Sequence, residues 1–196
     1  MRITVWNYVT LDGVMQGPGH PEEETRDGFT QGGWAGPYMD EVMGAEAGKG
    51  IAAGAGGAML FGRRTYEKME AAWRNGPADS PFTKVMNERQ KYVVSRTLDG
   101  PLDWENSELL KGEAVETVAR LRSESDRNAV ILGSGELIQS LLPHGLIDSV
   151  SLAIFPLTLG AGRRLFPDGG APANFELVEV KSTTTGVLLA RYEPAA

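Results

Sequence analysis

The sequence contains no cysteine and only two histidines, His20 and His144, among its 196 residues. Without cysteine the chain can form no disulfide, can use no thiol as a nucleophile and can offer no thiolate to a metal. Because the two histidines stand far apart in the sequence, we expect no multi-histidine metal site either. The composition therefore predicts a protein without a bound metal.

The sequence also lacks a basic region and a long apolar segment. Its formal net charge is −7, and its lysines and arginines are spread along the chain rather than clustered, whereas a nucleic-acid surface needs a concentrated basic face. No apolar run approaches the ~18 residues of a membrane span, and the alternating N-terminal segment has no signal-peptide core. We therefore expect a cytoplasmic protein with neither a nucleic-acid nor a membrane partner.

The hydrophobic pattern predicts a single α/β domain over residues 1–196, a length that suits one sizeable core. The pattern predicts strands at 2–10, 58–62, 91–97, 129–132 and 146–160, and helices at 38–53, 65–72, 81–89, 112–125 and 135–142. This alternation is typical of a mainly parallel sheet with helices on both faces. Residues 175–194 predict a C-terminal antiparallel hairpin that turns near Thr185 and Gly186, and residues 13–37 predict a long loop, functional or disordered.

Three polar segments directly follow predicted strands: "GRRT" at 62–65, "SRT" at 95–97 and "GSGE" at 133–136. Ligands of open α/β sheets bind beyond the carboxyl ends of the strands, where helix N-termini and guanidinium groups favour phosphate. Residues 62–65 alone are more simply explained as a strand–turn–helix connection with solvent-facing arginines. Three such segments, each closing a different strand, favour a phosphate-containing ligand. The last is not a dinucleotide fingerprint, because Ile138 stands where that motif needs its third glycine.

These segments belong to a wider set of motifs: "TLDG" at 10–13, "LFGRRTYE" at 60–67, "KYVVSRT" at 91–97, "ILGSGEL" at 131–137, "LIDSVSLAIFPLTLGAGRRLF" at 146–166 and "TGVLLARYE" at 185–193. In this order they resemble the dihydrofolate reductase-like superfamily. More narrowly, the chain resembles the stand-alone relatives of the reductase domain that ends bacterial bifunctional riboflavin-biosynthesis proteins. The resemblance covers most of the chain and implies the dihydrofolate reductase-like fold.

The resemblance also implies NADPH as the cofactor. The family segments that approach it correspond to Gly62, Arg63 and Thr65 for the phosphates, Ser95 and Arg96 for the adenosine ribose and its 2′-phosphate, Gly133, Ser134, Gly135, Glu136 and Leu137 for the pyrophosphate, and Thr10, Leu11 and Asp12 for the surroundings of the nicotinamide. Two cations, Arg63 and Arg96, would favour NADPH over NADH. Since Glu136 is negatively charged, we expect it to point away from the bound phosphate.

Two acidic residues are candidates for the catalytic proton donor, Glu46 and Asp12. Folate reductases carry an acidic residue on the helix before the "GR-T" strand, and the resemblance assigns that place to Glu46. On a helical wheel Glu46 shares an arc with Val42 and Met43, where burial would favour the protonated form; a frayed helix end would instead leave it in water. Asp12 precedes a glycine after a strand, which is typical of a turn residue, although the resemblance places it near the nicotinamide.

The sequence thus predicts an NADPH-dependent reductase that transfers hydride to a small heterocyclic substrate, pterin-like or pyrimidine-like. The alternative is a cofactor-binding or ligand-sequestering protein of the same fold without efficient reductase activity, because fold does not establish function. Residues 13–37 would form a lid that excludes water during hydride transfer. The resemblance further implies a homodimer formed through the late strands, and the apolar segment "VSLAIFPLTL" at 150–159 is compatible with one.

Overall fold

The structure, a computed structural model, describes residues 1–53 and 57–195, with the backbone alone for residues 49–53. The elements run along the chain as β1 (Ile3–Thr10), η1 (Arg26–Gly28), η2 (Gly36–Tyr38), α1 (Glu41–Ala53), β2 (Ala58–Gly62), α2 (Arg63–Trp73), α3 (Pro81–Glu88), β3 (Lys91–Ser95), β4 (Ser107–Lys111), α4 (Ala114–Glu124), β5 (Ala129–Leu132), α5 (Gly135–Leu141), η3 (Leu142–His144), β6 (Ser149–Phe155), β7 (Phe175–Ser182) and β8 (Leu188–Pro194).

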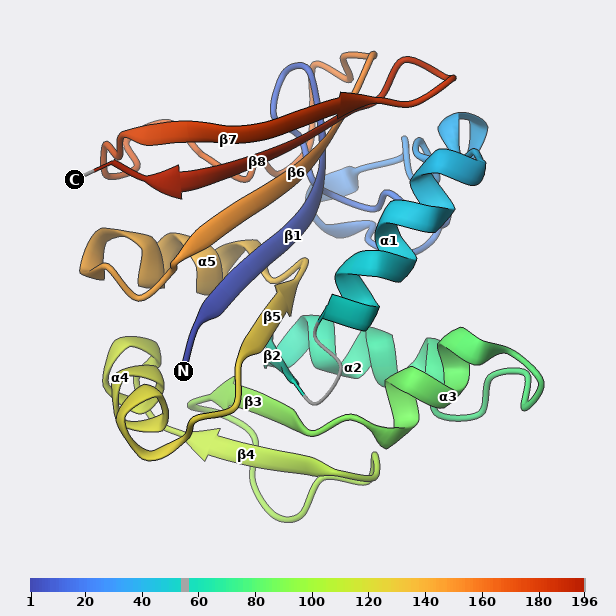
Figure 1. Ribbon diagram of the computed structural model, residues 1–196. Helices are drawn as coiled ribbons and strands as arrows, with labels where there is room; N and C mark the ends of the chain where they lie inside the picture. Colours follow the sequence, from blue (N-terminus) through green and yellow to red (C-terminus); the bar gives the residue numbers. More distant parts are fainter. Residues whose placement is uncertain (54–56, 196) are drawn as a thin grey trace.

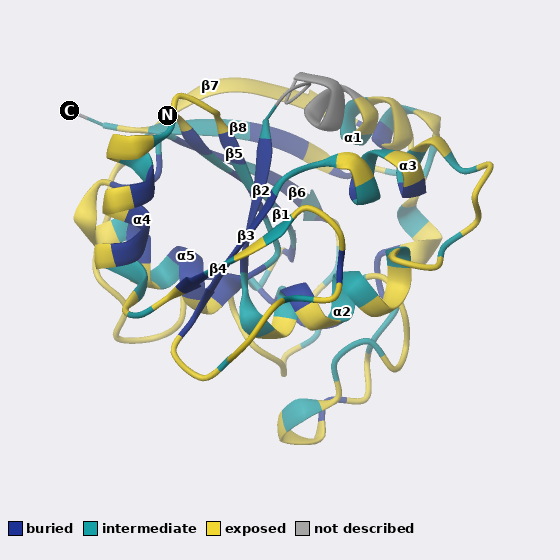
Figure 2. Cartoon of the chain, turned by 90° about the horizontal axis from the view of Figure 1, so that it is seen from below, coloured by how far each residue is buried: buried dark blue, intermediate teal, exposed yellow. Residues whose placement is uncertain are grey.

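The strands form one sheet in the order β4-β3-β2-β5-β1-β6-β8-β7. Neighbouring strands from β4 to β6 are parallel, whereas β8 is antiparallel to both β6 and β7. Helices α4 and α5 cover one face and α1, α2 and α3 the other (Figures 1 and 2). The predicted α/β fold is therefore confirmed: a mainly parallel sheet, helices on both faces and a C-terminal antiparallel hairpin.

Strand β1 shows how the sequence separates the two faces of the sheet. Its side chains alternate, so that Ile3, Val5 and Val9 are buried in the core beneath α4 and α5. Trp6 and Tyr8 point to the opposite face, where they are only partly buried and line a cavity. The alternation that makes β1 a strand thus also presents two aromatic side chains to this cavity.

Three local predictions are wrong. Strand β4 was not expected, because only Leu110 of its five residues is buried and the strand lies at the edge of the sheet. The apolar segment 146–160, predicted as a strand interrupted at Pro156, is a strand only over Ser149–Phe155 and ends at that proline, which cannot donate to a ladder. Helix α2 begins at Arg63 with Gly62 as its N-cap, so Thr65 lies within the first turn.

Lys91 is a fully buried cation that fastens the β4 side of the sheet. Its ammonium donates to the carbonyl oxygens of Asn87 at 3.1 Å, Arg89 at 2.7 Å and Glu105 at 2.9 Å, and it lies 4.5 Å from the ring centroid of Trp104. Two of these carbonyls end helix α3, so the ammonium satisfies groups that a helix terminus leaves free. Lys91 therefore joins α3 to the segment that precedes β4.

Replacing Lys91 by methionine keeps most of the side-chain volume but removes all three donors. We expect Lys91→Met to lower the free energy of unfolding by about 2–4 kcal/mol, because buried carbonyls lose their partners. Urea denaturation measures this loss. The control is Lys84→Met on α3, whose ammonium is 69% exposed in a pair with Glu88; a surface change of this kind should stay within about 0.5 kcal/mol. Equal stability of the two variants would contradict the role of Lys91.

Candidate active site

A cavity of about 1800 Å³ runs along one face of the sheet and reaches the carboxyl ends of the parallel strands. Strands β3, β2 and β5 are consecutive in the sheet, so the three polar segments that follow them meet at one edge. The cavity is lined by ten of the residues predicted for the cofactor: Gly62, Arg63, Thr65, Ser95, Arg96, Gly133, Ser134, Gly135, Glu136 and Leu137. Its other walls come from β1, α1, α2 and the loop 13–37.

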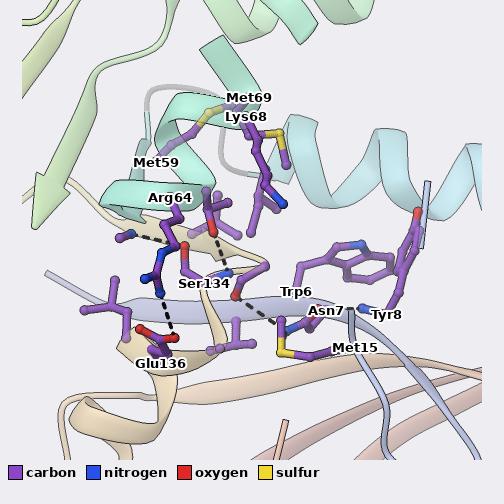
Figure 3. A pocket seen from close by; sticks show the side chains of 18 of the residues that line it. Trp6, Asn7, Tyr8, Met15, Met59, Arg64, Lys68, Met69, Ser134 and Glu136 are labelled. Carbon is purple, nitrogen blue, oxygen red and sulfur yellow. Dashed lines mark hydrogen bonds and ion pairs between the residues drawn. The ribbon is translucent and has the colours of Figure 1, made fainter. Parts of the chain in front are cut away.

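The turn between β5 and α5 is the most highly connected part of this edge. Gly133 and Ser134 both adopt the left-handed conformation, with φ of 61° and 52°. The Ser134 backbone N–H donates to the Thr65 hydroxyl at 3.2 Å, and the Ser134 hydroxyl accepts from the Gly62 N–H at 3.1 Å (Figure 3). The Asn7 amide donates to the Gly133 carbonyl at 3.4 Å. One turn thus joins the end of β5 to the end of β2, to the first turn of α2 and to the middle of β1.

Ile138 explains why this turn needs no third glycine. Its side chain is fully buried in the core on the α4 and α5 side of the sheet, so the position serves packing rather than close approach of a ligand. Gly135 is the residue that allows a close approach, because a Cβ there would lie 2.3 Å from the sulfur of Met15. At this point of the cavity wall Met15 therefore packs directly against Gly135, the first residue of α5.

Glu136 lies among three guanidinium groups. Its carboxylate is 3.1 Å from Arg64, 3.2 Å from Arg163 and 3.6 Å from Arg26 (Figure 3 shows the pair with Arg64). These residues come from α2, from the segment after β6 and from the 13–37 loop, and all line the cavity. Arg26 is also paired with Glu24 at 2.7 Å and Arg163 with Asp27 at 3.8 Å, so the cluster is a network of both signs. Its guanidinium groups stand at the N-terminus of α5, an arrangement that can bind a phosphate.

The other two predicted arginines also line the cavity, but their partners lie at its rim. Arg63 pairs with Glu67 one turn further along α2, at 3.3 Å, and Arg96 pairs with Glu113 at 3.2 Å. These are exposed pairs, which are weak and exchange readily. Sequence reasoning did not connect Arg26 or Arg163 with Glu136, because Arg26 lies in the 13–37 loop, Arg163 lies in the segment after β6, and no local pattern relates either of them to Glu136.

Thr10, Leu11 and Asp12 are not among the described residues that line the cavity. Thr10 is buried, and its hydroxyl donates to the Asp12 carboxylate at 2.5 Å. The carboxylate also accepts from the backbone N–H groups of Gly160 at 2.8 Å and Leu159 at 3.2 Å. The Thr10 hydroxyl and these N–H groups lower the pKa of Asp12. In this structure Asp12 therefore holds the segment after β6 against the end of β1 as an ionised turn residue.

Glu46, the other predicted catalytic residue, does line the cavity. Its carboxylate pairs with the Lys181 ammonium of β7 at 2.7 Å, and its side chain is 23% exposed. The pair joins α1 to the edge strand of the sheet, and both residues line the same cavity as Trp6 and Tyr8. We call this part of the cavity the opening under α1. An ammonium at this distance favours the carboxylate form over the protonated one.

The loop 13–37 is an ordered wall of the cavity. Val14, Phe29, Trp34 and Ala35 are buried in a core cluster with Phe155. Glu24 fastens the loop to α2, because its carboxylate accepts from Arg26 at 2.7 Å and from Lys68 at 2.5 Å. Burial raises the pKa of Glu24, but the hydrogen bonds from Arg26 and Lys68 outweigh it and lower the pKa to about 2.

Within residues 1–53 and 57–195, no cluster of three or more histidine, aspartate or glutamate side chains is arranged to hold a metal ion. In the same part of the chain, no helix combines the length and the apolar character needed to cross a bilayer. A site built from this chain's described residues therefore has arginines, backbone N–H groups and aromatic rings as its binding groups.

The strand order, the terminal hairpin and the cavity at the carboxyl edge define a protein of the dihydrofolate reductase-like fold. The model of the RibD C-terminal domain matches residues 2–189. The chain therefore belongs to the RibD C-terminal domain family, and the predicted resemblance is confirmed.

Individual relatives agree with this assignment. The uncharacterized protein YyaP of Bacillus subtilis is 27% identical over 136 residues, which are 66% of this chain and 70% of YyaP. A structure from Shewanella sp. PV-4, named for riboflavin biosynthesis, has a TM-score of 0.69 at 20% identity and full coverage of both chains. At such identities these likenesses show the fold.

Two further structures have names that describe reductases. The Thermotoga maritima diaminohydroxyphosphoribosylaminopyrimidine deaminase/5-amino-6-(5-phosphoribosylamino)uracil reductase has a TM-score of 0.67 at 15% identity, with 99% of this chain and 56% of that chain covered. The Enterococcus faecalis dihydrofolate reductase, complexed with NADP(H) and RAB-propyl, has a TM-score of 0.61 at 14% identity, with coverage of 100% and 97%.

The fastening of the loop by Glu24 predicts an acid-sensitive contribution to stability. Because the folded-state pKa of about 2 lies below the unfolded value of about 4.3, this contribution is complete above about pH 5 and disappears as the pH falls toward 2. We expect Glu24→Gln to cost about 2 kcal/mol at neutral pH and nothing near pH 2. Urea denaturation at a series of pH values measures the difference. Exposed Glu22 in the same loop gives the control, Glu22→Gln, and a Glu24→Gln difference that does not change with pH would refute the assignment.

Proposed function

We propose that the protein is an NADPH-dependent reductase that transfers hydride to a small heterocyclic, pyrimidine-like or pterin-like substrate. The observation that carries the proposal is the meeting of the three polar segments at the ends of β3, β2 and β5, beside the arginine cluster around Glu136. Membership of the RibD C-terminal domain family supports a reductase. The Enterococcus faecalis reductase with its NADP(H) supports the choice of cofactor.

The size and charge of the cavity suit two ligands side by side. A volume of about 1800 Å³ exceeds the roughly 300–1,000 Å³ of a typical single-ligand pocket. The pyrophosphate of NADPH would lie at the Gly133–Gly135 turn, where the N-terminus of α5 is flanked by Arg64 and Arg163. The 2′-phosphate would lie near Ser95 and Arg96. Glu136 would then share its guanidinium partners with the cofactor rather than repel it.

The opening under α1 suits the substrate. Its floor offers the rings of Trp6 and Tyr8, which can pack on a planar heterocycle. Its wall offers the Glu46–Lys181 pair, an acceptor beside a donor, which matches the N–H and C=O groups along one edge of a pyrimidine or pterin. In this proposal Glu46 binds the substrate edge in its carboxylate form. The reductase half of the Thermotoga maritima relative, whose name contains a uracil, supports a pyrimidine-like substrate.

Two arginine variants test the placement of the cofactor. Arg64→Gln should weaken NADPH and NADH binding alike, about tenfold, because both cofactors carry the pyrophosphate and one charge-assisted contact is lost. Arg96→Gln should weaken NADPH by a similar factor and leave NADH nearly unchanged, since NADH lacks the 2′-phosphate. Quenching of tryptophan fluorescence measures both affinities, because Trp6 lines the cavity.

The matched control for these variants is Arg74→Gln. Arg74 ends helix α2, pairs with Glu70 at 3.1 Å and is not among the cavity-lining residues, so neither affinity should change. Failure of the wild-type protein to bind either cofactor would defeat the proposed function. If Arg96→Gln weakened NADPH and NADH binding equally, the 2′-phosphate would not lie near Ser95 and Arg96.

We also propose that the protein forms a homodimer through β7. This edge strand and its hairpin partner expose Leu177, Val178, Val180 and Leu188, and an exposed apolar edge strand is a surface for pairing. Val180→Glu should convert dimers to monomers, as measured by sedimentation velocity. A monomeric wild-type protein at micromolar concentration would contradict the dimer without affecting the cofactor site.

A further inference from the structure

Reduction of a C=N or C=O group needs a proton as well as a hydride, and the structure limits where that proton can come from. Asp12 does not line the cavity among the described residues. Glu46 does, but the Lys181 ammonium 2.7 Å away favours its charged form, which cannot donate. Another O–H group on the substrate side of the cavity is therefore of interest.

Tyr8 presents such a group. It projects from β1 on the same face as Trp6, and both side chains point toward α1 over the opening that we assign to the substrate (Figure 3). Its ring packs on Phe155 with a centroid separation of 5.3 Å and an interplanar angle of 54°. This contact fixes the ring, so that the hydroxyl has one preferred position at the cavity wall.

The chemistry of Trp6 limits how it can interact with the Tyr8 hydroxyl. An indole N–H can only donate, so toward Trp6 the Tyr8 oxygen can only accept, and the Tyr8 hydrogen stays available for an acceptor in the cavity. Burial raises the pKa of Tyr8, which keeps the phenol protonated, and the Trp6 side chain lowers it by a smaller amount.

We propose that Tyr8 is a catalytic residue that donates its hydroxyl proton to the substrate heteroatom during hydride transfer. This inference rests on the proposed reductase function. NADPH, when bound, would supply the hydride with its electron pair. The substrate carbon would gain the C–H bond while the π electrons of its C=N or C=O bond move to the heteroatom. The Tyr8 O–H bond breaks as the heteroatom takes the proton, and water in the open cavity returns a proton to the tyrosinate. NADPH is oxidised and the substrate is reduced by two electrons.

The test compares Tyr8→Phe with Tyr38→Phe. Each variant removes one phenolic hydroxyl group from a ring that packs on Phe155. Tyr8→Phe keeps the packing on Phe155. Tyr38→Phe is the matched control, because the Tyr38 ring packs on Phe155 at 5.9 Å but Tyr38 is not among the cavity-lining residues. Oxidation of NADPH is followed with 7,8-dihydrofolate as the C=N probe, and binding is followed with the planar heterocycle pteridine-2,4-dione in the presence of NADP⁺.

For Tyr8→Phe we expect kcat to fall about 100-fold, the lower end of the range for general acid catalysis, with NADPH affinity and melting temperature unchanged. Tyr38→Phe should leave kcat unchanged. Glu46→Gln provides the contrast, because loss of a substrate-binding carboxylate should mainly raise KM. If wild-type protein binds pteridine-2,4-dione but reduces neither probe, the reductase function fails. In that case the affinity for pteridine-2,4-dione tests the role of Tyr8. Binding about tenfold weaker in Tyr8→Phe but not in Tyr38→Phe would support the Tyr8 hydroxyl as the hydrogen-bond donor to the ligand.

Three results would overturn the proposal. The first is a Tyr8→Phe variant with wild-type kcat and wild-type affinity for pteridine-2,4-dione. The second is an equal loss in Tyr38→Phe, which would assign the effect to packing on Phe155. The third is a wild-type protein that neither binds nor reduces either probe, in which case the donor role and the reductase function fail together.

Discussion

The left-handed turn at Gly133 and Ser134 is the constraint on which the cavity depends. The Ser134 hydroxyl and N–H hold Gly62 and Thr65, and the Gly133 carbonyl holds Asn7. Gly62 ends β2, Thr65 lies in the first turn of α2 and Asn7 lies within β1, so the turn joins the end of β5 to two strands and a helix while the N-terminus of α5 faces the cavity. A non-glycine residue in this conformation is costly, and here Ser134 offsets that cost with two hydrogen bonds. The phosphate end of the cavity is thus rigid because its backbone is fixed from three sides.

The arginines gathered at the cavity contrast with the negative net charge of the whole chain. The chain carries −7, yet Arg26, Arg64 and Arg163 converge on the single carboxylate of Glu136. The expectation that Glu136 points away from a bound phosphate stays a prediction, and in the structure its carboxylate lies among these guanidinium groups. A carboxylate within such a cluster keeps the guanidinium groups in place without a ligand, and a phosphate that enters can share them at little cost in side-chain entropy. The acidic remainder of the surface opposes binding of anions elsewhere.

The sequence was sufficient for features whose signal is local. The alternation in β1, the strand-turn-helix pattern around Gly133 and the hairpin near Gly186 all depend on neighbouring residues, and each appears in the structure. Strand β4 has no comparable signal, because an exposed edge strand with one buried residue resembles a loop. The convergence of Arg26 and Arg163 on Glu136, the pair between Glu46 and Lys181 and the burial of Lys91 are long-range consequences of strand order, which no window of sequence contains.

The two ends of the cavity differ in how firmly their side chains are held. The phosphate end combines backbone N–H groups with flexible guanidinium groups, so it can bind a cofactor tightly while the side chains adjust. The end under α1 is different, because Trp6 and Tyr8 both project from β1 and the Tyr8 ring packs on Phe155. A group bound there would meet a hydroxyl whose ring is held by packing. Since hydride transfer depends on geometry more than on affinity, the proposed reaction is best placed at this aromatic end, and in the proposed function the arginines would hold the cofactor beside it.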